Sequence, residues 1–143
     1  MIELSDDLAR LDVGRIHGWL ASSYWSPGIA RAAIERQIAG AHCLGAFAEE
    51  GQVGFARVIS DRASFAWIAD VWVAERQRGQ GLGRQMVRWF LDHPDYATIR
   101  RFALVTGDAH GVYAALGFHA PLRPERYMER LSADFAARLR EPS

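Results

Sequence analysis

The residues best suited to chemistry stand in one short segment of the sequence, Arg76-Gln77-Arg78-Gly79-Gln80-Gly81-Leu82-Gly83-Arg84. Glycines let the backbone of a loop approach a ligand closely, and the free amide groups that begin a following helix attract an anion. Arg84 and Arg88 stand four residues apart, so on a helix they would repel each other and oppose its dipole. The segment therefore predicts an anion site, suited to phosphate, that is formed by Arg78, Gly79, Gln80, Gly81, Leu82, Gly83 and Arg84.

Known nucleotide-binding loops fit this segment poorly. Its glycines lack the spacing of the dinucleotide fingerprint, and no Lys-Ser or Lys-Thr pair follows them as in a P-loop. All 17 basic residues are arginines, which excludes Schiff-base chemistry as well as a phosphate-binding lysine. A plain alternative stays open, in which the arginines point into water or pair with Glu75.

The segment lies between elements that would hold it in position. Residues 65–73 are apolar on both faces except at Asp70, which predicts a central strand covered on both sides. Residues 82–91 have the spacing of an amphipathic helix that ends before His93-Pro94. A short strand over 102–106 would complete a βαβ unit, so the sheet should be partly parallel.

The flanking sequence predicts further elements. We expect a short first strand, a helix over 8–20 capped by Asp6 or Asp12, a helix over 27–38, a hairpin of strands 42–48 and 53–59, a short helix over 111–116, and weak edge strands that include residues 127–129. The fold class is therefore α/β (α+β). It consists of a mixed, mostly antiparallel sheet of six to seven strands with about four helices, in a single domain over residues 1–143.

Composition limits the classes of partner. The chain has 143 residues and a formal net charge of zero, so no overall field attracts it to nucleic acid or to an anionic membrane. Cys43, the only cysteine, stands in an apolar run and is expected to be buried. No signal peptide and no membrane-spanning stretch is recognisable. We expect a cytoplasmic protein without nucleic acid, membrane or metal partners.

Two linked motifs resemble those of the GNAT superfamily of acyl-CoA N-acyltransferases. Arg78-x-x-Gly81-x-Gly83 is similar to the family's pyrophosphate-binding motif, and Tyr113-Ala114-Ala115-Leu116-Gly117-Phe118 is similar to its Tyr-x-x-Leu-Gly-Phe signature. The stretches Tyr24–Ile29 and Asp108–Tyr113 resemble a subgroup of small bacterial GNAT proteins. The sequence departs from the family pattern at Gly107-Asp108, where an Asn is frequent, and it has no recognisable catalytic Glu.

The resemblance implies a fold, a cofactor and an activity. The fourth and fifth strands would splay apart and admit the pantetheine arm of acetyl-CoA along Val71, Trp72 and Val73. An amine would attack the thioester directly, in a ternary complex, with its oxyanion held by a backbone amide of that strand. Tyr113 would be the general acid that protonates the leaving sulfur.

The remaining roles are assigned with alternatives. Asp70 is the first choice for general base, since a carboxylate in an apolar strand is costly unless it is bonded or used, and His110 is the second. Tyr24 and Trp25 fall where this fold binds its acceptor, here a primary amine of a small molecule or of a peptide. Each of these residues also has a purely structural interpretation, and a homodimer is left open.

Two other functions are compatible with the same sequence. One is a domain of this fold that binds acyl-CoA without catalysis, for example as a sensor. The other is an interaction module whose arginine-rich loop contacts the phosphates of a partner.

Overall fold

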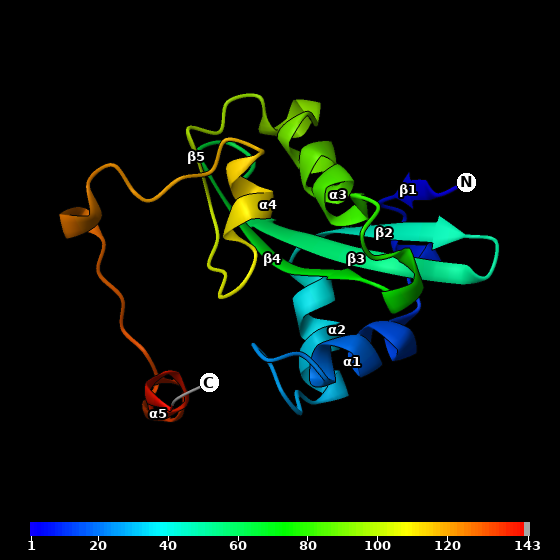
Figure 1. Cartoon of the computed structure of the whole chain (residues 1–143), viewed down its shortest axis with the longest axis horizontal. Coiled ribbons are helices and arrows are strands. Elements are labelled where there is room, and N and C mark those ends of the chain that lie inside the picture. Colours follow the sequence, from blue (N-terminus) through cyan, green and yellow to red (C-terminus); the bar gives the residue numbers. More distant parts are fainter. Residues whose placement is uncertain (142–143) are drawn as a thin grey trace.

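The computed structural model describes residues 1–141 of the chain and forms a twisted sheet with helices on both faces (Figure 1). The strands are β1 (Glu3–Ser5), β2 (His42–Ala48), β3 (Gly51–Ser60), β4 (Phe65–Val73) and β5 (Arg101–Ala103). The α-helices are α1 (Val13–Ala21), α2 (Arg31–Ala39), α3 (Leu82–Leu91), α4 (His110–Ala114) and α5 (Ala133–Arg140). Short 3-10 turns occur at η1 (Leu8–Arg10), η2 (Glu75–Gln77), η3 (Pro94–Tyr96) and η4 (Pro124–Arg126).

The sheet follows sequence order, β1-β2-β3-β4-β5. Its first three pairings are antiparallel and the last, β4 with β5, is parallel. The crossover from β4 to β5 passes through α3, which gives the predicted βαβ unit. The mixed and mostly antiparallel sheet is confirmed, but it has five strands in the described residues instead of six to seven.

Two apolar cores lie on opposite faces of the sheet. On one face α3 packs through Leu82, Met86, Val87 and Phe90, all less than 5% exposed. On the other face α1 and α2 bury Ile16, Leu20 and Ile34 against Phe55 and Cys43. The predicted burial of Cys43 is confirmed at 1% exposure. The two covered faces explain why β3 and β4 are apolar along nearly their whole length.

The first helix begins at Asp12, the later of its two predicted caps, and the second helix begins later than predicted. Asp12 accepts a hydrogen bond from the Arg15 amide at 3.0 Å and caps α1, while the preceding residues form the separate turn η1. The helix expected from residue 27 begins at Arg31, because Ser26 does not cap it. The Ser26 hydroxyl donates instead to Leu20 O at 3.1 Å, closing the end of α1.

The C-terminal part differs most from the expectation. The segment around Tyr127–Glu129 is extended but pairs with no strand of the described chain, so the predicted edge strands are absent. The strand expected at 102–106 is confined to Arg101–Ala103. A fifth helix, α5, was not predicted, and with residues 119–132 it stands apart from the sheet (Figure 1). No helix of residues 1–141 has both the length and the apolar character needed to cross a bilayer.

Candidate functional site

The glycine loop forms an open notch of backbone amides at the start of α3. Gly79 and Gly81 have φ angles of +80° and +79°, and a Cβ added at either would meet no atom within 4 Å. The first backbone hydrogen bond of α3 runs from Gln85 N to Gly81 O at 3.0 Å. The amides of residues 79–84 donate to no partner within the described chain, so they are available to an anion at the positive end of the helix.

The arginines of this loop are not neutralised by acidic side chains. Arg76, Arg78, Arg84 and Arg88 form no ion pair with any described residue, and the pairing with Glu75 considered from the sequence is absent there. The Arg78 side chain folds toward the sheet, where its Nε donates to Val73 O at 3.0 Å and its guanidinium lies 5.3 Å from the Trp72 ring centre. Positive charge therefore borders the notch at several points.

Strands β4 and β5 diverge beside this notch. Their parallel pairing covers only three positions and ends at Trp67 opposite Ala103. Val71, Trp72 and Val73 lie beyond that point, with β3 on one side and no strand of the described chain on the other. A β-bulge where β4 passes Ala56, with Asp70 at φ +55°, sharpens the bend of the strand. The result is an open strand edge that leads to the notch.

Asp70 is held in a buried ion pair. Its Oδ2 accepts from Arg57 Nε at 2.5 Å and its Oδ1 accepts from Trp25 Nε1 at 2.8 Å. The Asp70 side chain is 6% exposed and that of Arg57 is 12% exposed. Both carboxylate oxygens thus already have donors, and the pair fixes the loop that carries Trp25 to the middle of β4.

Aromatic side chains line the other end of the open edge. Trp25 lies between Tyr24 and Trp72, with ring centres 5.0 and 5.9 Å away. The Tyr24 hydroxyl accepts from the Gly107 amide at 3.0 Å and donates to Asp108 Oδ1 at 3.3 Å. The loop before α2 is therefore connected to the loop after β5, and the two predicted acceptor residues face the diverging strands.

Trp72 carries an unusual polar group. Its indole Nε1 is buried and has no hydrogen-bond partner in the described chain. Leaving a buried donor unpaired costs about 1–3 kcal/mol, so such groups are rare outside functional sites. Trp72 was predicted to act through its backbone, and the side-chain donor was missed because a sequence does not show which indoles find a partner.

Tyr113 lies on α4, half-buried, with the Phe118 ring centre 5.8 Å from its own. Burial raises the pKa of the Tyr113 hydroxyl above its usual value of 10.0, and the neighbouring Tyr24 and Asp108 raise it further. The hydroxyl is therefore a proton donor at neutral pH. His110, the first residue of α4, is exposed, and its side chain makes no hydrogen bond to another described residue.

Comparison with known proteins decides the family. The sequence model of the GNAT acetyltransferase domain family matches residues 39–120 of this chain. These residues include the notch, the open strand edge and Tyr113. The chain belongs to the GNAT acetyltransferase family. No curated protein matches the chain in sequence.

Solved structures agree with this GNAT assignment. A protein of Xanthomonas campestris, described as a candidate GNAT acetyltransferase, is 42% identical, with a TM-score of 0.88 over 92% of this chain and 94% of its own. Proteins from Staphylococcus aureus and Deinococcus radiodurans share the fold at 18% and 19% identity, with TM-scores of 0.75 and 0.71. They match 92% and 99% of this chain, and 99% and 94% of their own chains. The resemblance drawn from the sequence motifs is confirmed, and the family generally uses acetyl-CoA.

Two residues of this GNAT site were not predicted. Arg57 neutralises Asp70, and Asp108 accepts from Tyr24. A signal for Arg57 was present, since a lone arginine among the apolar residues of β3 requires a charged partner if it is inward-facing. Asp108 gave no such signal, because acidic residues are ordinary in loops.

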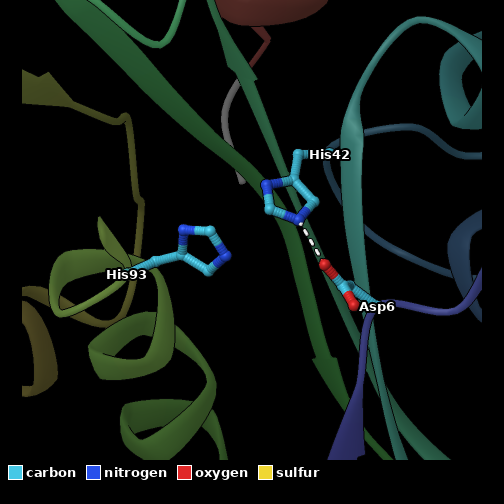
Figure 2. A group of neighbouring side chains, drawn as sticks. All are labelled: Asp6, His42 and His93. Atoms are coloured by element: carbon cyan, nitrogen blue, oxygen red, sulfur yellow. Dashed lines mark hydrogen bonds and ion pairs between the residues drawn. The ribbon is translucent and has the colours of Figure 1, made fainter. Parts of the chain in front are cut away.

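A second polar cluster joins β2 to the end of α3. Asp6, His42 and His93 have potential metal-ligand atoms within 4.8 Å of one another (Figure 2). His42 Nε2 donates to Asp6 Oδ2 at 2.9 Å, which leaves Nδ1 to accept from the Tyr96 hydroxyl at 2.7 Å. His93 Nδ1 accepts from the Asp95 amide at 3.0 Å. These bonds occupy both nitrogens of His42, so the geometry favours a hydrogen-bonded cluster over a metal site.

This cluster predicts a loss of stability in acid. Burial lowers the pKa of His42 from 6.5, and the hydrogen bond from His42 lowers the pKa of Asp6 from 3.8. The unfolded chain therefore binds more protons at both sites, and the free energy of unfolding should fall as the pH drops below about 6.5 and again below about 4. The positive charges of nearby Arg62 and His93 also lower the pKa of His42.

Urea unfolding at pH 7 and pH 5 would measure this effect. We expect His42→Phe to reduce the difference between the two pH values, whatever it does to stability at pH 7. The surface substitution His119→Gln should keep the wild-type difference. If His42→Phe shows the same difference in unfolding free energy between pH 7 and pH 5 as the wild type, other groups cause the acid sensitivity.

Proposed function

We propose that this protein transfers an acetyl group from acetyl-CoA to a primary amine of a small molecule by direct attack in a ternary complex. The observation that carries the proposal is the continuity of an open strand edge, Val71–Val73, with a notch of unpartnered amides at Gly79–Arg84. One feature suits the amide-rich pantetheine arm and the other suits a diphosphate. Acetyl-CoA supplies the activated acyl group, a thioester.

The residues present fit that cofactor. The amides of Gly81, Leu82 and Gly83 and the side chains of Arg78 and Arg84 would hold its diphosphate. The open space where a Cβ of Gly79 or Gly81 would lie allows close approach to the backbone. A backbone amide of Val71 or Trp72 would stabilise the oxyanion formed when the amine attacks.

Tyr113 is the proposed general acid. Its raised pKa keeps the hydroxyl protonated at neutral pH, so the proton is available to a leaving thiolate. Cys43 is a poor covalent nucleophile, because burial raises its pKa to about 11 and it is only 1% exposed. Direct transfer without an acyl-enzyme is therefore favoured.

The path of the amine proton follows from the same contacts. Asp70 was the first choice as base, but both of its oxygens already accept hydrogen bonds from Arg57 and Trp25. This arrangement favours a role in orienting Trp25. His110 is exposed and unbonded, so His110 or water is the better proton acceptor.

An assay of thiol release from acetyl-CoA with a panel of primary amines tests the proposed activity. We expect amine-dependent release of coenzyme A, together with thermal stabilisation of the protein by coenzyme A. Stabilisation without release for any amine would support the sensor alternative. Lack of stabilisation would reject the cofactor assignment and revive the phosphate-contacting module.

The unpaired indole of Trp72 leads to a specific prediction. If its Nε1 donates to the bound acceptor, Trp72→Phe should lower kcat/KM for that acceptor by roughly 5- to 150-fold, the equivalent of one hydrogen bond. The unliganded variant should be no less stable than the wild type, because an unsatisfied donor has been removed. Steady-state kinetics and thermal melts measure the two effects. Reduced stability with unchanged kinetics would mean that Trp72 serves only in packing.

A further inference from the structure

One arginine connects helix α5 to the loop that carries the predicted acceptor residues Tyr24 and Trp25. Arg138 Nη2 donates to the backbone oxygen of Trp25 at 3.1 Å, although the two residues are 113 positions apart in the chain. Its guanidinium also lies 5.4 Å from the ring centre of Phe135, one turn earlier on α5. These two contacts restrict a side chain that is otherwise long and flexible. The guanidinium is therefore held beside the acceptor loop.

Arg138 has no acidic partner in the part of the chain that the structure describes. Asp134 stands four residues earlier on α5, a spacing that favours an ion pair on a helix, but the pair is not formed. The single hydrogen bond to Trp25 leaves most N–H groups of the guanidinium free to donate. A planar fork of donors matches the two oxygens of a carboxylate. Arg138 therefore brings an uncompensated positive charge, suited to a carboxylate, to this loop.

A second unused donor faces the same loop. The ring centre of Trp72 lies 5.9 Å from that of Trp25, and the buried Trp72 Nε1 has no acceptor in the described chain. Asp70 adds no free negative charge, because Arg57 and Trp25 both donate to its carboxylate. Unpaired donors on both sides of Trp25 would be satisfied by oxygen atoms of a bound molecule.

The free charge on the Tyr24 side of the loop is negative. Asp108 accepts from the Tyr24 hydroxyl at 3.3 Å and forms no ion pair with a basic residue among residues 1–141. Its charge also acts on Tyr113, the proposed general acid, and raises the pKa of that hydroxyl. An ammonium group would therefore be attracted to the side of the loop that lies near the reaction.

We propose that the acceptor is an amino acid, a molecule that carries both an amine and a carboxylate, and that Arg138 determines this specificity by binding the carboxylate. The inference rests on the proposed acetyl transfer and names the class of its acceptor. The amine lies toward Asp108 and Tyr113, and the carboxylate lies toward Arg138. The new C–N bond forms as the thioester C–S bond breaks. The ammonium loses two protons on becoming an amide, of which the coenzyme A thiolate gains the equivalent of one and water takes the other.

Steady-state kinetics with matched pairs of acceptors give the first test. Glycine, γ-aminobutyrate and phenylalanine are compared with methylamine, propylamine and phenethylamine, the amines that lack their carboxylates. We expect kcat/KM of at least one amino acid to exceed that of its amine by at least ~10-fold. Turnover in which no amino acid exceeds its amine would overturn this proposal and leave acetyl transfer standing. Absence of release of coenzyme A with every amine would instead reject the proposed function.

Substitution of Arg138 tests the residue itself. Arg138→Gln should lower kcat/KM for the preferred amino acid at least ~10-fold, mainly through KM, and change that for the matched amine less than ~2-fold. Arg138→Lys keeps the charge without the planar fork and should retain part of the preference. Arg140→Gln is the matched control, because Arg140 is exposed on the same helix and its side chain has no hydrogen bond to a described residue. It should keep the wild-type preference.

A binding measurement separates recognition from a structural role of Arg138. The N-acetylated form of the preferred amino acid should raise the melting temperature of the wild type and of Arg140→Gln, but not that of Arg138→Gln. Melting of the unliganded variants shows whether each is folded. If Arg138→Gln lowers kcat/KM equally for the amino acid and its amine, Arg138 only holds α5 against the loop, and the proposal is wrong.

Discussion

Tyr113→Phe is expected to lower kcat of acetyl transfer by roughly 10²-fold or more, the contribution of a positioned general acid. Only the hydroxyl is lost, so the ring should keep its contact with Phe118, and KM for acetyl-CoA should change little. Because burial raises the pKa of Tyr113, the wild type should retain its acid through neutral pH and lose activity only at alkaline pH. The variant should lack this alkaline limb.

A pH profile of kcat for both proteins is the measurement. Tyr127→Phe removes a hydroxyl from an exposed tyrosine and should leave the profile unchanged. If Tyr113→Phe keeps the wild-type rate across the pH range, the leaving group takes its proton from solvent. Tyr113 would then be a packing residue of α4.

Gly81→Ala is expected to weaken coenzyme A binding at least ~10-fold. At φ +79° a side chain strains the backbone by about 1–3 kcal/mol, and the added Cβ projects into the open space of the notch. Both effects disturb the amides that begin α3, so the loss should appear in the dissociation constant measured by titration calorimetry. Salt should weaken wild-type binding, because the arginines of the notch are solvent-exposed.

Gly28→Ala is the control that separates the effect of backbone strain on stability from an effect on coenzyme A binding. Gly28 has a similar φ of +69°, and a Cβ there also meets no atom within 4 Å, but it belongs to the loop before α2. It should show a similar loss of stability with unchanged affinity for coenzyme A. Equal affinity losses in the two variants would mean that the notch is not the binding site.

The elements that could be predicted are those determined by residues close together in the sequence. The apolar runs of β2, β3 and β4 and the stripe of α3 determine those elements, and the glycine loop follows from residue types alone. The order of elements and the family could therefore be read from the sequence. The start of α1 could be narrowed to two caps, and the contact of Asp12 with the Arg15 amide decides between them.

The features that sequence could not supply depend on distant contacts. A buried Asp70 bonded to a neighbouring strand or to an arginine was one interpretation of the sequence. Its partners could not be identified, because Arg57 lies 13 residues away and Trp25 lies 45 residues away in the chain. The prediction of C-terminal strands was wrong for a related reason. The residues near Tyr127 have a propensity for extended structure, but a strand also needs a neighbouring strand to pair with, and none lies beside this segment in the described chain.

The bulge at Asp70 determines to which face of the sheet the following side chains of β4 point. Before it, the even-numbered Ala66 and Ile68 belong to the core under α3, and after it the odd-numbered Val71 and Val73 do. The extra residue in the bulge thus exchanges the faces of the sheet to which even- and odd-numbered side chains point. As a result, Trp72 points away from α3 and toward Trp25. Deleting a residue here would restore regular alternation and exchange the two linings, with valines facing the acceptor loop and the indole facing the helix.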